Sequence, residues 1–128
     1  MEKRLVVCDT NILIEFYKGN SEIINNLQGI GSQNIALSSV TAAELIFGAL
    51  NKKELKNIKR DLDQLFVIPL NEKISKNFID LMLEYTLSYN LDLPDALIAS
   101  TAIIYDLELY TLNKKHFKYI DDLKLWEV

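Results

Sequence analysis

The strongest constraint on the fold is the alternation of short apolar segments with longer segments of helical periodicity. Residues 4–8, RLVVC, are apolar and rich in β-branched side chains, which is typical of a buried strand, and helical spacing follows at once over 10–18. The same order returns at 34–39, where NIALSS precedes helical spacing over 41–50. Strands that alternate with helices favour a mostly parallel sheet with helices on both faces. We therefore predict an α/β fold.

The rest of the chain continues this alternation without repeats, linkers or low-complexity segments. Further helices are predicted at about 21–28, 55–66 and 72–89 and from Pro94 onward, and further strands at 67–70 and 107–112, with 123–128 as a candidate fifth strand. The run DALIASTAIIY that follows Pro94 is apolar on most sides, which predicts a buried central helix. We expect one domain over 1–128 with a four- to five-stranded sheet.

Charge and composition exclude several classes of protein. The 128 residues include 14 Lys and Arg against 18 Asp and Glu, a net charge of −4, which argues against a protein that coats nucleic acid through its positive charge. An enzyme that meets nucleic acid at one site is not excluded. Cys8 is the single cysteine, and neither a leader nor an apolar run of membrane-spanning length is present. We expect a cytoplasmic protein with no membrane association.

Three acidic residues, Asp9, Glu44 and Asp95, stand in apolar surroundings, where a carboxylate is costly unless it is paired or binds a metal. Each also has a structural explanation. Asp9 and Asp95 would lie at helix N-termini, which favour an anion, and Thr10 can cap the first of these helices. The string TAAE that begins at Thr41 and ends at Glu44 matches a capping box. Spacing in the sequence does not decide between these explanations and a shared site.

Four local strings occur in the order found in a known family. They are CDTNILIEF around Asp9, SSVTAAELIFGAL around Glu44, LPDALIASTAI around Asp95 and LYTLNKKHF near the end of the chain. Together they resemble the four motifs of the PIN-domain nucleases, and the closest match is to the VapC-type toxins of toxin–antitoxin pairs. The resemblance extends from Val6 to the terminal LKLWEV. It implies a PIN-like three-layer fold whose acids meet at the carboxyl edge of the sheet.

The resemblance also implies an activity, the Mg²⁺-dependent hydrolysis of RNA phosphodiester bonds by an endoribonuclease. Asp9, Glu44 and Asp95 would be the catalytic carboxylates that hold Mg²⁺, or Mn²⁺ in its place. Oxygen ligands suit these hard cations, which lower the pKa of bound water and neutralise charge that develops on a phosphoryl group. Such a mechanism needs no side-chain nucleophile.

Four further residues match supporting positions of the family. Thr10 and Asn11 belong to the DTN string, and Thr111 matches a hydroxyl that supports the first aspartate. Asn113 stands where the family often has a fourth acid. Its neutral oxygen favours one metal ion, or a second ion that arrives with the RNA. Asp92 could supply the missing negative charge, although a solvated turn is its simpler role.

Several other groups receive no catalytic role. His116 lies among lysines in KKHFKYI, which is more typical of a surface or phosphate-contacting residue than of a general base. Cys8 alternates with Asp9 along the strand and is expected in the core. The segments 52–60 and 114–118 are basic, and we expect them either to be solvated or to follow an RNA backbone beside the acidic site.

Partners follow from the resemblance as well. It implies a homodimer and a cognate VapB-type antitoxin, both of which would use apolar helix surface around Phe16 and Phe47. Alternatives remain open: a PIN nuclease outside a toxin pair, or a catalytically weak PIN-like module that binds RNA or protein. A receiver-type signalling domain is disfavoured, because it needs clustered acids after the first strand and an aspartate after a middle strand, which VIPLNE lacks.

Overall fold

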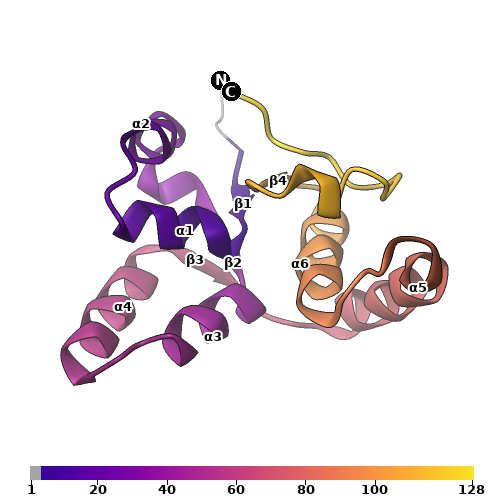
Figure 1. Ribbon diagram of the computed structural model, residues 1–128, viewed down its shortest axis with the longest axis horizontal. Helices are drawn as coiled ribbons and strands as arrows, with labels where there is room; N and C mark the ends of the chain where they lie inside the picture. Colours follow the sequence, from indigo (N-terminus) through magenta and orange to yellow (C-terminus); the bar gives the residue numbers. More distant parts are fainter. Residues whose placement is uncertain (1–3) are drawn as a thin grey trace.

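The computed structural model describes residues 4–128, which form one sheet and the helices around it (Figure 1). The strands are β1 (Val6–Cys8), β2 (Ile35–Ser38), β3 (Phe66–Ile68) and β4 (Glu108–Tyr110). The helices are α1 (Thr10–Tyr17), α2 (Ser21–Ile30), α3 (Ser39–Phe47), α4 (Lys52–Gln64), α5 (Glu72–Tyr89) and α6 (Leu93–Ile104), with short 3₁₀ turns η1 (Ser32–Asn34) and η2 (Lys114–His116). All strand pairs are parallel, which confirms the predicted α/β class.

The strand order, β3-β2-β1-β4, makes β1 a central strand. The chain moves outward from β1 to β2 and β3, and it returns through α5 and α6 to place β4 on the other side of β1. The connections on the two sides of β1 therefore run in opposite directions. In parallel sheets this reversal opens a crevice at the carboxyl ends of the strands, where ligands bind.

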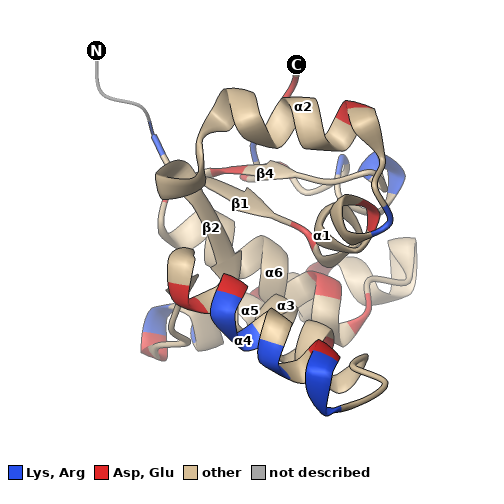
Figure 2. Ribbon diagram, turned by 90° about the vertical axis from the view of Figure 1, so that its left-hand side faces the viewer, with Lys and Arg blue, Asp and Glu red and all other residues tan. Residues whose placement is uncertain are grey.

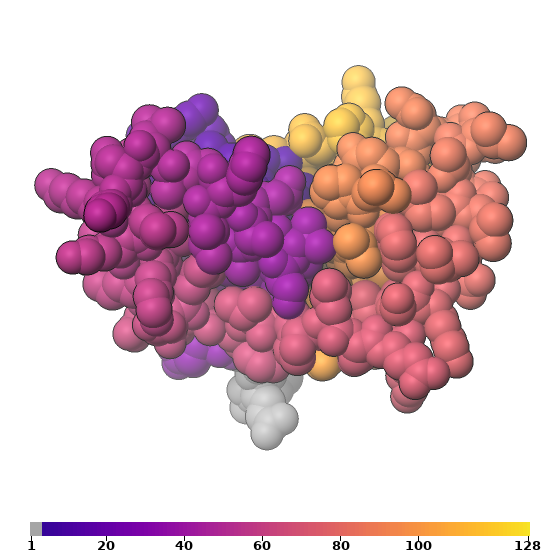
Figure 3. Space-filling view, turned by 90° about the horizontal axis from the view of Figure 1, so that it is seen from below, coloured from indigo at the N-terminus to yellow at the C-terminus, as the bar shows by residue number. Residues whose placement is uncertain are grey.

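Alternate side chains of the strands enter two separate cores. Val7 and Ile68 pack with α5 and α6 on one face, whereas Val6, Cys8 and Leu37 pack with α1 and α2 on the other. This alternation is the period of two expected of a strand, and it produces the predicted three layers. In the space-filling view, the purple and magenta atoms of the chain's first half lie side by side with the salmon and orange atoms of α5 and α6 (Figure 3).

The structure corrects two predicted boundaries. The candidate fifth strand at 123–128 is wrong: the segment makes a single parallel bridge, between Leu109 and Leu125, and forms no strand. The strand predicted at 67–70 ends at Ile68, because Pro69 has no N–H to continue a ladder.

The predicted buried helix is α6. Its cap is Asp92, whose carboxylate accepts a hydrogen bond from the backbone N–H of Asp95, and Pro94 lies in the first turn. Ala96, Ile98 and other side chains of its body are at most 1% exposed. α6 is therefore a rigid element that carries Asp95 at its amino end. Among residues 4–128, no helix is both long and apolar enough to cross a bilayer.

Candidate functional site

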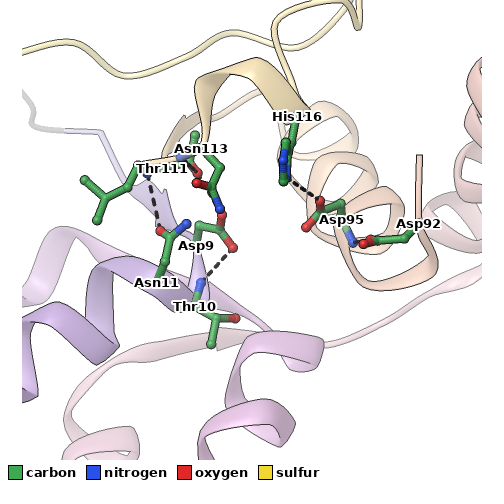
Figure 4. A network of polar contacts seen from close by, with 9 residues as sticks. Asp9, Thr10, Asn11, Asp92, Asp95, Thr111, Asn113 and His116 are labelled. Atoms are coloured by element: carbon green, nitrogen blue, oxygen red, sulfur yellow. Dashed lines mark hydrogen bonds and ion pairs between the residues drawn. The ribbon is translucent and has the colours of Figure 1, made fainter. Parts of the chain in front are cut away.

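The carboxyl end of β1 places Asp9 at the crevice beside β4. Asp9 is 5% exposed, and it caps α1 by accepting a hydrogen bond from the backbone N–H of Thr10 at 2.7 Å. The hydroxyl of Thr111, directly after β4, donates to the other carboxylate oxygen at 2.8 Å (Figure 4). The cap of α1 is thus Asp9 and not Thr10, which corrects the alternative considered from the sequence. The Asp9 carboxylate is therefore oriented by two groups, one that follows β1 and one that follows the neighbouring strand β4.

Burial raises the pKa of the Asp9 carboxyl. The hydrogen bonds from Thr111 and Thr10 act in the opposite direction, because they stabilise the charged form, while the nearby Glu44 carboxylate raises the pKa further and His116 lowers it. A buried carboxylate that also faces a second acid favours a neighbouring cation.

Glu44 lies on α3, which contacts both α1 and α6. Its carboxylate accepts a hydrogen bond of 2.7 Å from the hydroxyl of Thr10, and that hydroxyl lies 3.1 Å from the hydroxyl of Thr41. The predicted capping box at Thr41 is wrong, because α3 begins earlier and its cap is Ser38, which accepts from the N–H of Val40. Glu44 is therefore held by a residue of the DTN string and not by its own helix end.

Asp95 lies in the first turn of α6, with a side chain that is 21% exposed. Burial, together with the charges of Asp92, Asp9 and Glu44, raises the pKa of Asp95 to about 6, and only His116 opposes this shift. His116 Nδ1, at the end of η2, lies 3.5 Å from an Asp95 carboxylate oxygen (Figure 4). Ionisation of Asp95 therefore costs more free energy than that of an exposed aspartate, and a nearby cation would lower this cost.

The amide residues bridge the loops around the site. Asn11 Oδ1 accepts a hydrogen bond of 3.3 Å from the backbone N–H of Leu112, which links α1 to the loop after β4. The backbone N–H of Asn113 donates to the hydroxyl of Thr111 at 3.0 Å, and its side chain is exposed. Asn113 therefore helps to fix the hydroxyl that orients Asp9.

Two residues near the acids, Asp92 and His116, had not been predicted to act on Asp95. Asp92 is the cap of α6 and raises the pKa of Asp95, while His116 contacts Asp95 directly. The Asp92 cap was predictable from its position before Leu93 and Pro94. The sequence carried no signal for the His116 contact, since it depends on how η2 is positioned over α6.

The donor set fits a hard divalent cation that keeps much of its water. Across residues 4–128, no three Asp, Glu, His or Cys side chains converge closely enough to form a metal-binding group by themselves, so any ion here would depend on water for most of its ligands. Mg²⁺ commonly uses one or two carboxylates and several waters, so an open arrangement of carboxylate oxygens suits it. Burial first, and nearby acids second, raise the pKa values of Asp9 and Asp95, and a bound cation would oppose both effects.

A comparison with family models decides where the chain belongs. The model described as PIN domain matches residues 6–123. The chain belongs to the PIN domain family. This PIN domain is 34% identical over 122 residues to Ribonuclease VapC10 of Mycobacterium tuberculosis, covering 94% of this chain and 91% of that protein. It is 32% identical to Ribonuclease VapC1 of Methanocaldococcus jannaschii, with coverage of 97% and 87%.

Solved structures give the same fold. The PIN domain matches a toxin-antitoxin complex from Klebsiella pneumoniae with a TM-score of 0.80 and 31% identity, covering 96% of this chain and 99% of that one. It matches VapBC2 from Rickettsia felis, bound to a DNA fragment from their promoter, with a TM-score of 0.78 and 31% identity over the same shares. PIN-domain ribonucleases generally depend on divalent metal ions. The receiver-type alternative is excluded by the family match and by the strand order.

Proposed function

We propose that this protein is a Mg²⁺-dependent endoribonuclease, the toxin of a VapBC pair, and that residues 1–128 act as one PIN domain. The observation that carries the proposal is the set of acids Asp9, Glu44 and Asp95 at the carboxyl edge of the sheet, where the charge of Glu44 raises the pKa of Asp9 and the charges of Asp9 and Glu44 raise that of Asp95. Relatives named ribonuclease VapC support the activity, and similar toxin–antitoxin complexes support the pairing.

In this proposal Asp9, Glu44 and Asp95 are the catalytic residues, and they hold Mg²⁺ or Mn²⁺ with water as the remaining ligand. A divalent ion at such a site lowers the pKa of a water molecule and neutralises charge on the phosphoryl oxygens during hydrolysis. Thr111 fixes the orientation of Asp9, and Thr10 fixes that of Glu44. Their hydrogen bonds keep the carboxylates in place before RNA arrives.

The neutral side chain of Asn113 favours a site for one ion, with a second ion entering only together with RNA phosphate. Asn11 and Asn113 act through the loop after β4, where their contacts hold Leu112 and Thr111. Titration of the RNA-free protein with Mn²⁺ should therefore give one tight site per chain. Two equally tight sites would contradict this part of the proposal.

We place the candidate surface for the antitoxin on the side of α1 that faces α2 and α4. A cavity of about 420 Å³ between α1, α2 and α4 is lined by apolar side chains that include Phe16, Ile24 and Leu62. It can receive an apolar segment of a VapB-type partner, and the existence of such a partner is supported by the similar structures, which are toxin–antitoxin complexes. Binding there would silence the nuclease in the cytoplasm until the antitoxin is lost.

Homodimerisation has a different candidate surface on α5. Ile79, Leu83 and Leu87 recur every four residues and are 52%, 80% and 99% exposed. Such a row lies along one side of the helix and would be covered in a dimer. A sedimentation measurement on Leu87→Glu tests this: the variant should be monomeric where the natural chain is a dimer.

The basic segment 52–60 forms the exposed surface of α4, where its blue Lys and Arg positions alternate with red acids (Figure 2). Ion pairs of Lys59 with Asp63 and Arg60 with Asp61 offset part of this charge. The segment therefore contributes general attraction for RNA and no selectivity for sequence.

The activity is tested by incubating the purified protein with RNA in Mg²⁺, in excess chelator, and in chelator followed by Mg²⁺. Cleavage should stop with chelator and return with the metal, and Asp9→Asn should be inactive in every condition. Cleavage that survives chelation, or an undiminished Asp9→Asn variant, would contradict the assignment. Tight RNA binding without any cleavage would favour the catalytically weak module.

A further inference from the structure

Two tyrosines beside the acidic site form a parallel stack. Tyr89 is the last residue of α5, and Tyr119 follows η2. Their ring centroids are 4.1 Å apart and their planes differ by 3°. A third ring, that of the buried Tyr85, meets the edge of this pair, with its centroid 5.2 Å from that of Tyr119. Figure 1 shows the C-terminal segment passing over α6 towards α5, which brings these distant parts of the chain together.

The stack is held rigidly, yet one of its rings is open to solvent. Phe117 and Ile120, on either side of Tyr119, are 1% and 2% exposed, and Leu91 after Tyr89 is 4% exposed. Tyr89 itself is 55% exposed. Because Tyr119 covers one face of the Tyr89 ring, the exposed area includes the opposite face. A flat aromatic surface of this kind can take a further ring.

The stack lies within electrostatic reach of the acids. After burial, the charges of Asp95 and Asp92 are the leading causes that raise the pKa of Tyr119. Both tyrosines are also close in sequence to residues of the acidic site. Tyr89 precedes Asp92, the cap of α6, by three residues. Tyr119 follows His116, which contacts Asp95, by three residues. The two segments that carry the stack therefore adjoin the residues that carry Asp92, Asp95 and His116.

We propose that the Tyr89–Tyr119 stack is a platform for one unpaired nucleobase of the RNA substrate, next to the bond that is cut. The inference rests on the proposed ribonuclease function. Aromatic side chains hold single-stranded nucleic acid by stacking, and nearby cations hold its backbone. The exposed Lys115 and Lys118 lie on the same segment as Tyr119 and supply those cations. The base must be unpaired, because bases in an RNA helix do not offer a free face.

Binding of an unpaired RNA oligonucleotide that contains 2-aminopurine tests the platform directly, since stacking quenches its fluorescence. The Asp9→Asn protein with Mg²⁺ keeps the RNA intact. Adding Tyr89→Leu should weaken binding by about 5- to 100-fold and abolish the quenching. Adding Tyr89→Phe should preserve both, because the ring remains. Ser88→Ala, an exposed change beside Tyr89 on the same helix, is the control and should alter neither.

Cleavage assays on the natural chain and on Tyr89→Leu, both with Asp9 intact, distinguish the proposed platform from the proposed ribonuclease activity. An RNA series that lacks one base at each position in turn should contain one position where loss of the base slows the natural enzyme but not Tyr89→Leu. Tyr89→Leu that binds, quenches and cleaves as its parent does would overturn the platform and leave the ribonuclease intact. An Asp9→Asn parent that binds no RNA, together with a natural chain that cuts none, would overturn both.

Discussion

The first turn of α6 and the body of the same helix have opposite effects on the folded state. The body is buried, with Ile98 and Ala99 at most 1% exposed, and burial of a side chain such as Ile contributes roughly 1.5–3 kcal/mol. The first turn carries Asp95, whose pKa of about 6 means that its charge at neutral pH lowers stability. The contrast teaches that a rigid, stabilising helix holds a destabilised carboxylate where the chemistry needs it.

The largest effect should come from changing the first turn. Asp95→Asn removes a proposed metal ligand while keeping the shape of the side chain, and we expect RNA cleavage to fall by about 100-fold or more. Asp92→Asn is the matched control: asparagine also caps helices well, so cleavage should change little. Initial rates at saturating Mg²⁺ measure both. Equal losses in the two variants would remove the distinction between ligand and cap.

A change in the body should reverse the pattern, with stability lost and chemistry kept. Ile98→Ala leaves a cavity in the core and should lower the free energy of unfolding by about 2–5 kcal/mol. Leu93→Ala, at a site that is 59% exposed in the first turn, should lower it far less. Urea denaturation gives both values. Cleavage per folded molecule should be unchanged in each, and a loss of cleavage without unfolding would contradict the comparison.

A smaller effect is expected at Thr111, which orients Asp9 from β4. Thr111→Val keeps the shape but loses the hydrogen bond to the carboxylate, and we expect cleavage to fall by about 10- to 100-fold. Because that bond lowers the pKa of Asp9, the acidic limb of the activity profile should also move to higher pH. Thr111→Ser retains the hydroxyl and should restore both properties. Similar behaviour of the Val and Ser variants would exclude this role.

The smallest effect is on stability as a function of pH. Asp95 has an ordinary pKa of 3.8 when unfolded and about 6 when folded, so between these values the folded state binds the proton more tightly. Stability from this group is present below pH 3.8 and is lost as pH rises through 6. Metal-free Asp95→Asn should therefore melt at a higher temperature than the natural chain at pH 7, and at nearly the same temperature at pH 4. A variant that is less stable at pH 7 would contradict the contrast.

Local patterns in the sequence predicted the parallel sheet and the buried helix α6, because these depend on the periodicity of apolar residues. The sequence offered both Asp9, at the helix N-terminus, and Thr10 as a cap for α1, and it could not choose between them until the end of β1 was known. The α3 cap was misplaced for a similar reason, because Ser38 and Thr41 both suit a helix start. The predicted fifth strand failed because Leu125 alone aligns with β4.

The sequence could not predict contacts between side chains that lie far apart along the chain. His116 reaches Asp95, and Tyr89 stacks on Tyr119, only through the path of the chain around α6. Sequence spacing gives no measure of these distances. The acids themselves were predictable because each lies in a recognisable string, whereas the residues that surround them depend on packing.

The central claim, that Asp9, Glu44 and Asp95 hold a divalent ion with which RNA is cut, is tested most directly by measuring metal uptake and cleavage on the same samples. Mn²⁺ binding followed by electron paramagnetic resonance should show one bound ion per natural chain and a matching rise in cleavage. Asp9→Asn and Asp95→Asn should show neither, while remaining folded. Variants that bind Mn²⁺ as tightly as the natural chain, or cleavage that does not follow metal uptake, would contradict the claim.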